Sequence, residues 1–456
     1  MTTLPEHALQ DIQTRLNEAD KRVATIYPGD RPDRQPVQTV YGGAQLFTSD
    51  VSRKLGEVSQ RIFREYAPDA AAFAQALELG GDAAFHRAVY AHVEHKLATE
   101  PIEDFRIDFE DGYGNRSDAE EDGHAIQDAE ALAKGLADGT LPPWTGIRVK
   151  PLTAELQRRS LRTLDLFLST LVRASGGQLP EHFVVTLPKI TDVAQVECFV
   201  EVLSRLEHAL GLPDGAVPIE LMVETTQSLF LPDGRLALPV LVKAGRGRVR
   251  GAHFGVYDYT AGVSVTAIHQ APGHPSCEFA RHIMQVSLAL TGVTLSDGAT
   301  TIMPVAPHRA PQGGSLSPAQ LEENRAAVHR AWRLHYDDVR RALREAFYQG
   351  WDLHPGQFPT RHAAVAAFFL ERNYHLTGSD ANTYSTAFDL MGIPGVWVTG
   401  YLSDKLFASR RADVALLMMT VMTAACGALM VFGGTSVAVF GVLLGVVGFT
   451  VWGAYS

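Results

Sequence analysis

The sequence predicts an α/β protein whose main part is a closed (β/α)₈ barrel. Short apolar stretches with a strand-like pattern recur along the chain, and helical patterns separate them. Eight such stretches occur over about 330 residues, which favours a closed parallel barrel over an open doubly wound sheet. We therefore expect residues 37–372 to form the barrel, after an N-terminal helix and linker at 1–36.

The stretch 104–110 illustrates the strand pattern. Phe105, Ile107 and Phe109 fall on one face of an extended chain, and charged residues fall on the other. The eight expected strands are 37–47, 104–110, 146–150, 182–190, 219–225, 249–258, 300–306 and 350–357. Expected helices lie at 6–24, 50–65, 69–79, 83–98, 118–136, 153–174, 192–210, 236–244, 276–291, 317–349 and from about 360 onward.

Composition and charge narrow the class of protein. A hydrophobic content of 46% and a charged content of 20% suit a globular chain with a large core. The net charge of −11 argues against a nucleic-acid partner. Cys198, Cys277 and Cys426 lie far apart and offer neither a zinc spacing nor a disulfide framework. We therefore expect a reducing compartment, with the barrel in the cytoplasm.

Charged residues stand where the expected strands end. They are Glu110, Asp111, Arg148, Lys189, Glu224, Asp258 and His354. Carboxylates that meet at the mouth of a barrel repel each other, and a hard divalent cation such as Mg²⁺ (or Mn²⁺) relieves that repulsion. An arginine nearby can bind a substrate carboxylate through two hydrogen bonds. Together these groups predict a site that holds a keto acid and stabilises an enolate while a carbon–carbon bond forms or breaks.

Each of these residues also has a structural interpretation. Glu224 or Asp258 could cap a helix or form an ion pair, and Arg148 could pair with a structural acid. His354, which precedes a proline, could cap a turn, and Lys189 could be a solvated strand end. Their joint occurrence at strand ends favours the catalytic interpretation.

Six short motifs carry a resemblance to a known family. They are IDFEDG (107–112), GIRVKP (146–151), LPK (187–189), VET (223–225), FGVYD (254–258) and LHPGQ (353–357). In their order and spacing, over about 37–372, the chain resembles the HpcH/HpaI aldolase and citrate lyase β-subunit superfamily. Malyl-CoA lyases are close to that superfamily, and malate synthase is a distant relative.

The resemblance implies roles for the motif residues. Glu224 and Asp258 match the metal-binding carboxylates, Arg148 matches the arginine that grips the keto acid, and Glu110 and Asp111 match the acidic pair lining the site. The implied activity is that of a Mg²⁺-dependent carbon–carbon lyase or aldolase. Its substrate would be a keto acid or hydroxy acid, or the CoA ester of one, and the reaction would pass through an enolate. We also expect a homo-oligomer formed through the barrel.

The chain departs from the family pattern in several places. The stretch 48–103 is longer than expected, and Lys150 stands where relatives often have asparagine. No coenzyme A signature stands out. In several relatives a segment after the eighth strand closes the site of a neighbouring subunit, and the sequence lacks a counterpart.

The composition changes near residue 373. The charged residues beyond this point are Asp380, Asp389, Asp404, Lys405, Arg410, Arg411 and Asp413. Residues 414–432 and 437–452 are apolar enough to predict membrane spans, and 381–402 predicts a weaker third span. The basic loop 403–411 should face the cytoplasm. We therefore expect 373–456 to be a short all-α transmembrane segment of two to three helices that anchors the barrel to a membrane, with a buried soluble helical hairpin as the alternative.

The loop GYLSDKLFASRR (400–411) resembles a loop of major facilitator superfamily transporters. Asp404, Arg410 and Arg411 match the gating charges of that loop. The resemblance covers roughly three helices, too few for the two opposing bundles that transport requires. Two further hypotheses remain open. The chain could be a membrane transport-associated protein whose barrel binds an organic acid, or a non-functional accidental fusion of an aldolase and a transporter fragment.

Overall fold

A computed structural model describes residues 9–311 and 313–374, together with a few positions between 420 and 446. The chain divides into two compact units, 1–66 with 95–365 and 67–94 with 366–456. In the part of the chain that is described, no helix combines the length and the apolar character needed to cross a membrane. The predicted spans at 381–402, 414–432 and 437–452, and the loop 403–411, lie outside the described residues except for those few positions.

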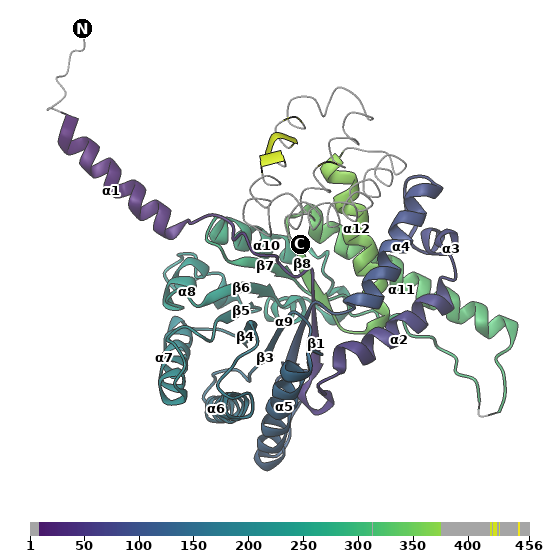
Figure 1. Ribbon diagram of the computed structural model, residues 1–456, viewed down its shortest axis with the longest axis horizontal. Coiled ribbons are helices and arrows are strands. Elements are labelled where there is room, and N and C mark those ends of the chain that lie inside the picture. The colour runs from purple at the N-terminus through teal and green to yellow at the C-terminus, as the bar shows by residue number, and fades with distance from the viewer. Residues whose placement is uncertain are drawn as a thin grey trace, which may run out of the picture. The chain divides into compact units, whose positions relative to one another are not determined.

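The first unit contains the predicted barrel. Eight parallel strands pair in chain order, and β8 closes the ring by pairing with β1. This confirms the α/β barrel fold class, and Figure 1 shows α5 to α8 on the outside of the strands. The strands are β1 (Gln38–Gly43), β2 (Asp104–Asp108), β3 (Trp144–Arg148), β4 (His182–Leu187), β5 (Ile219–Val223), β6 (Val249–Phe254), β7 (Thr294–Asp297) and β8 (Gln349–Asp352).

The helices follow the predicted pattern in most places. They are α1 (Gln10–Ile26), α2 (Val51–Tyr66), α3 (Ala70–Leu77), α4 (Ala83–Thr99), α5 (Asp118–Asp138), α6 (Gln157–Ala174), α7 (Val193–Leu210), α8 (Leu238–Ala244), α9 (Val256–Gly262), α10 (Pro275–Leu288), α11 (Pro318–Arg344) and α12 (Phe358–Tyr374). In α6, Leu164, Phe167, Leu168 and Leu171 recur at helical spacing and are buried. Such a stripe is what fixes a helix against a sheet.

The predicted seventh strand, 300–306, is wrong. The seventh strand lies earlier in the chain, at β7 (Thr294–Asp297), which pairs with β6 at Gly251 and with β8 at Gln349. The stretch 300–306 is more apolar, but it contains Pro304, which has no N–H to donate to a sheet. Those residues instead belong to the loop that follows β7, and the helix predicted at 276–291 already ends at Leu288.

The predicted sixth strand, 249–258, is too long. β6 ends at Phe254, and α9 begins two residues later. Asp258 therefore lies in the first turn of a helix and not on a strand. A carboxylate at that position interacts favourably with the positive end of the helix dipole.

The interior of the barrel carries buried charges. Arg106 Nε and Nη2 donate to Glu220 Oε2 and Oε1, at 3.1 and 2.7 Å, and Arg106 also pairs with Asp104. His253 Nδ1 accepts from Trp351 Nε1 at 2.9 Å, which leaves His253 Nε2, 3.2 Å from Glu220 Oε1, to carry the proton. Burial alone would raise the pKa of Glu220, but Arg106 and His253 hold it below its usual value.

The second unit includes α3 and most of α4. Asp69 caps α3, since its Oδ1 accepts from Ala72 N at 2.8 Å. The Tyr90 hydroxyl donates to Ala67 O at 2.9 Å, and the rings of Phe73 and Tyr90 meet edge to face. These residues lie within the long 48–103 stretch between β1 and β2.

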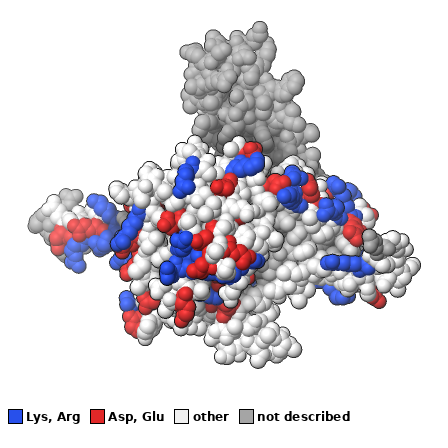
Figure 2. Space-filling model, turned by 90° about the horizontal axis from the view of Figure 1, so that it is seen from below, with Lys and Arg blue, Asp and Glu red and all other residues white. Residues whose placement is uncertain are grey.

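Charges of both signs are interspersed on the surface. Figure 2 shows Lys and Arg side chains among Asp and Glu side chains over the described residues of the face that it displays. The net charge of −11 is therefore not gathered into one acidic area on that face.

Asp128 provides a test of the packing between α5 and the barrel. Its side chain is 1% exposed, its Oδ2 has no hydrogen-bond partner, and burial raises the pKa of Asp128 to about 8. Between the ordinary pKa and about 8, the folded chain keeps a proton that the unfolded chain releases. The free energy of unfolding should therefore fall as pH rises through this range, by up to about 1.4 kcal/mol per pH unit.

We predict that Asp128→Asn reduces this slope and makes the chain more stable than wild type at pH 8, by about 2 kcal/mol. Urea unfolding at pH 5 and pH 8 measures the difference. Glu130→Gln, at an exposed position of the same helix, is the matched control and should keep the wild-type slope. Equal slopes in wild type and Asp128→Asn would contradict the prediction.

Candidate active site

Five successive strands bring charged side chains to one end of the barrel. Glu110 and Asp111 follow β2, Arg148 ends β3, Lys189 follows β4, Glu224 follows β5, and Asp258 lies in α9 behind β6. Because all eight strands are parallel, these positions share the carboxyl-terminal rim, where barrel enzymes carry their catalytic groups.

Asp108, which is not among the residues predicted from the sequence, organises this rim. Its Oδ1 accepts from Arg148 Nε at 2.7 Å and from Glu110 N at 3.0 Å. Its Oδ2 accepts from Arg148 Nη2 at 2.5 Å and from Gly112 N at 2.7 Å. One buried carboxylate thus holds both the arginine and the loop that carries the two acids. Asp108 lies beside Arg148 in the register of β2 and β3, a relation that exists only in the folded sheet.

Arg148 keeps one nitrogen directed at the acidic pair. Nη1 lies 3.1 Å from Glu110 Oε2 and 3.4 Å from Asp111 Oδ2, and the guanidinium stands over the Tyr41 ring at 4.9 Å. Burial opposes the charge of Arg148, but Asp108 and Glu110 raise its pKa well above the usual value. The group is therefore a fixed cation with a defined orientation.

Lys189 is the point where the carboxylates of the site meet. Its Nζ lies 2.5 Å from Glu110 Oε1, 3.3 Å from both Asp111 carboxylate oxygens and 3.4 Å from Asp258 Oδ2. Its backbone N–H donates to Glu224 Oε1 at 2.7 Å. The backbone at Lys189 has φ of 49°, a left-handed conformation that is uncommon outside glycine.

The site holds more negative than positive charge. Among the described residues discussed above, five carboxylates (Asp108, Glu110, Asp111, Glu224 and Asp258) face two cations (Arg148 and Lys189). Burial raises the pKa of Glu110 to about 7. Burial, with a further contribution from Asp258, raises the pKa of Glu224 to about 8. For Asp111, burial is outweighed by Glu110 and Arg148, which lower its pKa. An additional cation would relieve this imbalance.

The donor set fits a hard divalent cation with few protein ligands. No cluster of three or more His, Cys, Asp or Glu suited to a metal occurs within the described residues. Mg²⁺, however, is usually held by one or two carboxylates and completes its octahedron with water and substrate oxygens. Glu224 and Asp258 provide two such carboxylates, and both contact Lys189, Glu224 through the backbone N–H and Asp258 through the ammonium.

The remaining predicted residues have structural contacts. His354 caps the short 3₁₀ turn Pro355–Gln357, since its Nδ1 accepts from Gly356 N at 3.0 Å, and burial lowers its pKa. In the described part of the chain no contact of His354 supports a catalytic role, which stays a prediction. Lys150 donates to Phe109 O at 2.6 Å and lies 3.1 Å from Glu121 Oε2. It therefore supports the acidic loop from behind.

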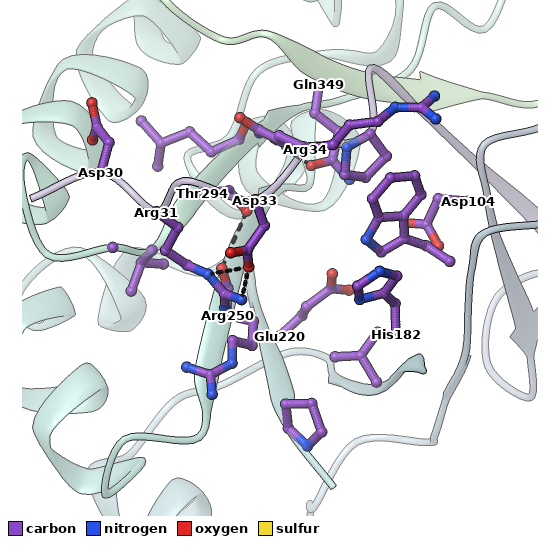
Figure 3. A pocket seen from close by; sticks show the side chains of 18 of the residues that line it. Asp30, Arg31, Asp33, Arg34, Asp104, His182, Glu220, Arg250, Thr294 and Gln349 are labelled. Carbon is purple, nitrogen blue, oxygen red and sulfur yellow. Dashed lines mark hydrogen bonds and ion pairs between the residues drawn. The ribbon is translucent and has the colours of Figure 1, made fainter. Parts of the chain in front are cut away.

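A cavity of about 810 Å³ lies at the opposite end of the barrel. Figure 3 shows that residues near the starts of strands line it, together with the linker that carries Arg31 and Arg34. Two of its arginines are paired with acids. Arg31 pairs with Asp33, and Arg34 lies 2.8 Å from Glu103. The cavity therefore does not share the converging carboxylates of the opposite rim.

Comparison with known proteins gives a family match and distant structural likenesses. The model of the family described as a domain of unknown function, DUF6986, matches residues 16–430. The sequence matches no curated protein.

Among solved structures, the chain is similar to the lead(II) complex of Haloferax volcanii malate synthase. The identity is 14%, the match covers 73% of this chain and 74% of that one, and the TM-score is 0.44. The magnesium/glyoxylate complex of the same enzyme has 12% identity, coverage of 84% and 98%, and a TM-score of 0.44. The citrate lyase β subunit from M. tuberculosis, complexed with oxaloacetate and magnesium, has 16% identity, coverage of 72% and 96%, and a TM-score of 0.36.

Gly255 offers a test of how tightly the rim is packed. A Cβ at this position would lie 2.6 Å from both Cβ and Oε2 of Glu224. We predict that Gly255→Ala displaces Glu224 and lowers the free energy of unfolding by about 1–3 kcal/mol. Gly123, inside α5, has nothing within 4 Å of such a Cβ, so Gly123→Ala should be neutral or stabilising. Urea denaturation compares the two variants, and equal effects would contradict the geometry described for Glu224.

Proposed function

This chain belongs to the DUF6986 family, and we propose that its barrel is a Mg²⁺-dependent carbon–carbon lyase or aldolase. The substrate would be a keto acid or hydroxy acid, or the CoA ester of one, and the reaction would proceed through an enolate. One observation carries the proposal, namely that acidic side chains from three strand ends converge on Lys189, Glu110 and Asp258 at its ammonium and Glu224 at its backbone N–H. This convergence occurs at the rim where barrel enzymes perform their chemistry.

Glu224 and Asp258 would hold the metal. When bound, Mg²⁺ supplies a Lewis acid that polarises a carbonyl oxygen and favours the enolate. Glu224 is 2% exposed and receives the Lys189 backbone N–H, so its carboxylate is held in one place. Asp258 is more exposed, and the first turn of α9 presents it.

Arg148 would bind the carboxylate of the substrate. Asp108 occupies Nε and Nη2, which leaves Nη1 as the nitrogen directed toward the acidic pair. Its contact with Asp111 is long, at 3.4 Å, and the Asp111 side chain is 54% exposed. A substrate carboxylate could therefore replace Asp111 at Nη1 while Asp108 keeps the guanidinium in position, and such preorganisation favours binding and catalysis.

Glu110 would act as the general base and acid that accepts a proton from the substrate and returns it. It is buried beside Arg148 and Lys189, and burial raises its pKa to about 7, where a carboxyl group can both accept and return a proton. In the cleavage direction, the substrate hydroxyl would pass its proton to Glu110 as the carbon–carbon bond breaks into a carbonyl and an enolate. Return of a proton to the enolate carbon would then complete the second product.

A lysine-dependent aldolase is disfavoured. Schiff-base formation needs a neutral amine. Burial would lower the pKa of Lys189, but Glu224 and Glu110 outweigh that effect and raise it. The amine therefore stays an ammonium, and Lys189 is suited to compensating charge.

We predict that the purified chain cleaves or condenses members of a panel of 2-keto acids, 3-hydroxy acids and their CoA esters with Mg²⁺, and that EDTA abolishes this activity. Glu224→Gln and Asp258→Asn should each lower turnover by at least about 100-fold, because each removes one of the two charged ligands. Asp233→Asn, at an exposed position paired with Arg235, is the control. Unchanged turnover and metal affinity in either rim variant would refute the site. Use of a CoA ester and assembly into a homo-oligomer stay predictions.

The C-terminal segment supports a separate proposal, that it anchors the chain to a membrane. No charged residue follows Asp413 in an apolar stretch long enough to span a bilayer. The family match extends to residue 430, past the change in composition near 373, which argues against an accidental junction at that point. The full chain should stay in the membrane pellet after an alkaline wash and be released by detergent, whereas a chain ending at Arg372 should not pellet. Recovery of the full chain without detergent would contradict the anchor.

A further inference from the structure

We propose that the Lys189 ammonium competes with the divalent cation for the same carboxylates, so that Lys189 weakens metal binding until an anionic substrate arrives. The inference rests on the proposed function, since it assumes that Glu224 and Asp258 hold the metal. It adds that a cation of the chain itself, the Lys189 ammonium, already lies among the carboxylates that would bind the metal.

The contacts of Lys189 place both cations in one region. The Nζ lies 3.4 Å from Asp258 Oδ2, and the backbone N–H of the same residue donates to Glu224 Oε1 at 2.7 Å. A single residue therefore touches both proposed ligands, one through its side chain and one through its backbone. A cation held by Asp258 would therefore share that carboxylate with the ammonium.

The acids on the other side keep the ammonium in place. Glu110 Oε1 lies 2.5 Å from Nζ, and both Asp111 oxygens lie at 3.3 Å. Positive charges at such short range repel each other. The metal can therefore bind only if Lys189 moves or if further negative charge enters the site. The Lys189 side chain is 28% exposed, and its long flexible stem allows it to turn toward solvent.

An anionic substrate changes this balance. A carboxylate bound at Arg148 adds negative charge to the rim and is a further partner for the ammonium. Metal and substrate should therefore strengthen each other's binding by the same factor, as linkage requires. Without Lys189 the repulsion is absent, so metal alone should bind tightly and the gain from substrate should shrink.

The test measures Mn²⁺ binding to the full chain by calorimetry and by electron paramagnetic resonance, without substrate. Lys189→Met should bind Mn²⁺ about 10-fold more tightly than wild type or better. Lys189→Arg, which keeps the charge, should stay near wild type. Lys134→Met, which removes an exposed ammonium from α5, is the matched control and should bind as wild type does. Adding pyruvate should tighten Mn²⁺ binding more in wild type than in Lys189→Met.

The outcomes separate this inference from the proposed function. Unchanged or weaker Mn²⁺ binding in Lys189→Met, with binding lost in Glu224→Gln, overturns the competition and leaves the metal site standing. Equal binding by wild type and Glu224→Gln, or no binding by any variant, overturns both. If circular dichroism shows that Lys189→Met does not fold, Lys189→Asn gives the same test, because asparagine also removes the ammonium and tolerates the left-handed backbone at this position.

Discussion

The interaction between Asp108 and Arg148 is the one on which the rest of the site depends. Asp108 uses both oxygens to hold the guanidinium and, at the same time, the backbone N–H groups of Glu110 and Gly112. The orientation of the arginine and the position of the acidic loop are therefore set by a single buried carboxylate. Removing one partner of such a pair would leave the other charged and buried, which costs several kcal/mol in typical cases.

Closure of the barrel imposes a second constraint. It places the ends of five successive strands side by side, and the chain has acids at three of them. Carboxylates gathered in one place repel each other, and protons, fixed cations or a metal can relieve that repulsion. Three features of the site relieve this repulsion. They are the raised pKa values of Glu110 and Glu224, the position of Lys189 and the proposed Mg²⁺.

The polar interior of the barrel connects to this rim through Tyr41. Its hydroxyl lies 3.3 Å from His253 Nδ1, and its ring lies under the Arg148 guanidinium. The network of Arg106, Glu220 and His253 thus reaches the site through one aromatic side chain. Buried ion pairs of this kind contribute less to stability than an apolar core of the same volume. Tyr41 contacts this network on one side and the Arg148 guanidinium on the other.

The barrel class could be predicted from the sequence, because strand periodicity and the alternation of strands with helices follow from local pattern. Glu110, Asp111, Arg148, Lys189, Glu224 and Asp258 all reach the same rim as expected. Tertiary structure decided what depends on pairing between distant segments. It placed β7 at 294–297 and showed Asp108 as the partner of Arg148. It showed that His354 caps a turn and that Lys189 lies among the acidic side chains. Local pattern could not supply these results, since hydrogen bonds and repulsions across the barrel exist only once the ring is closed.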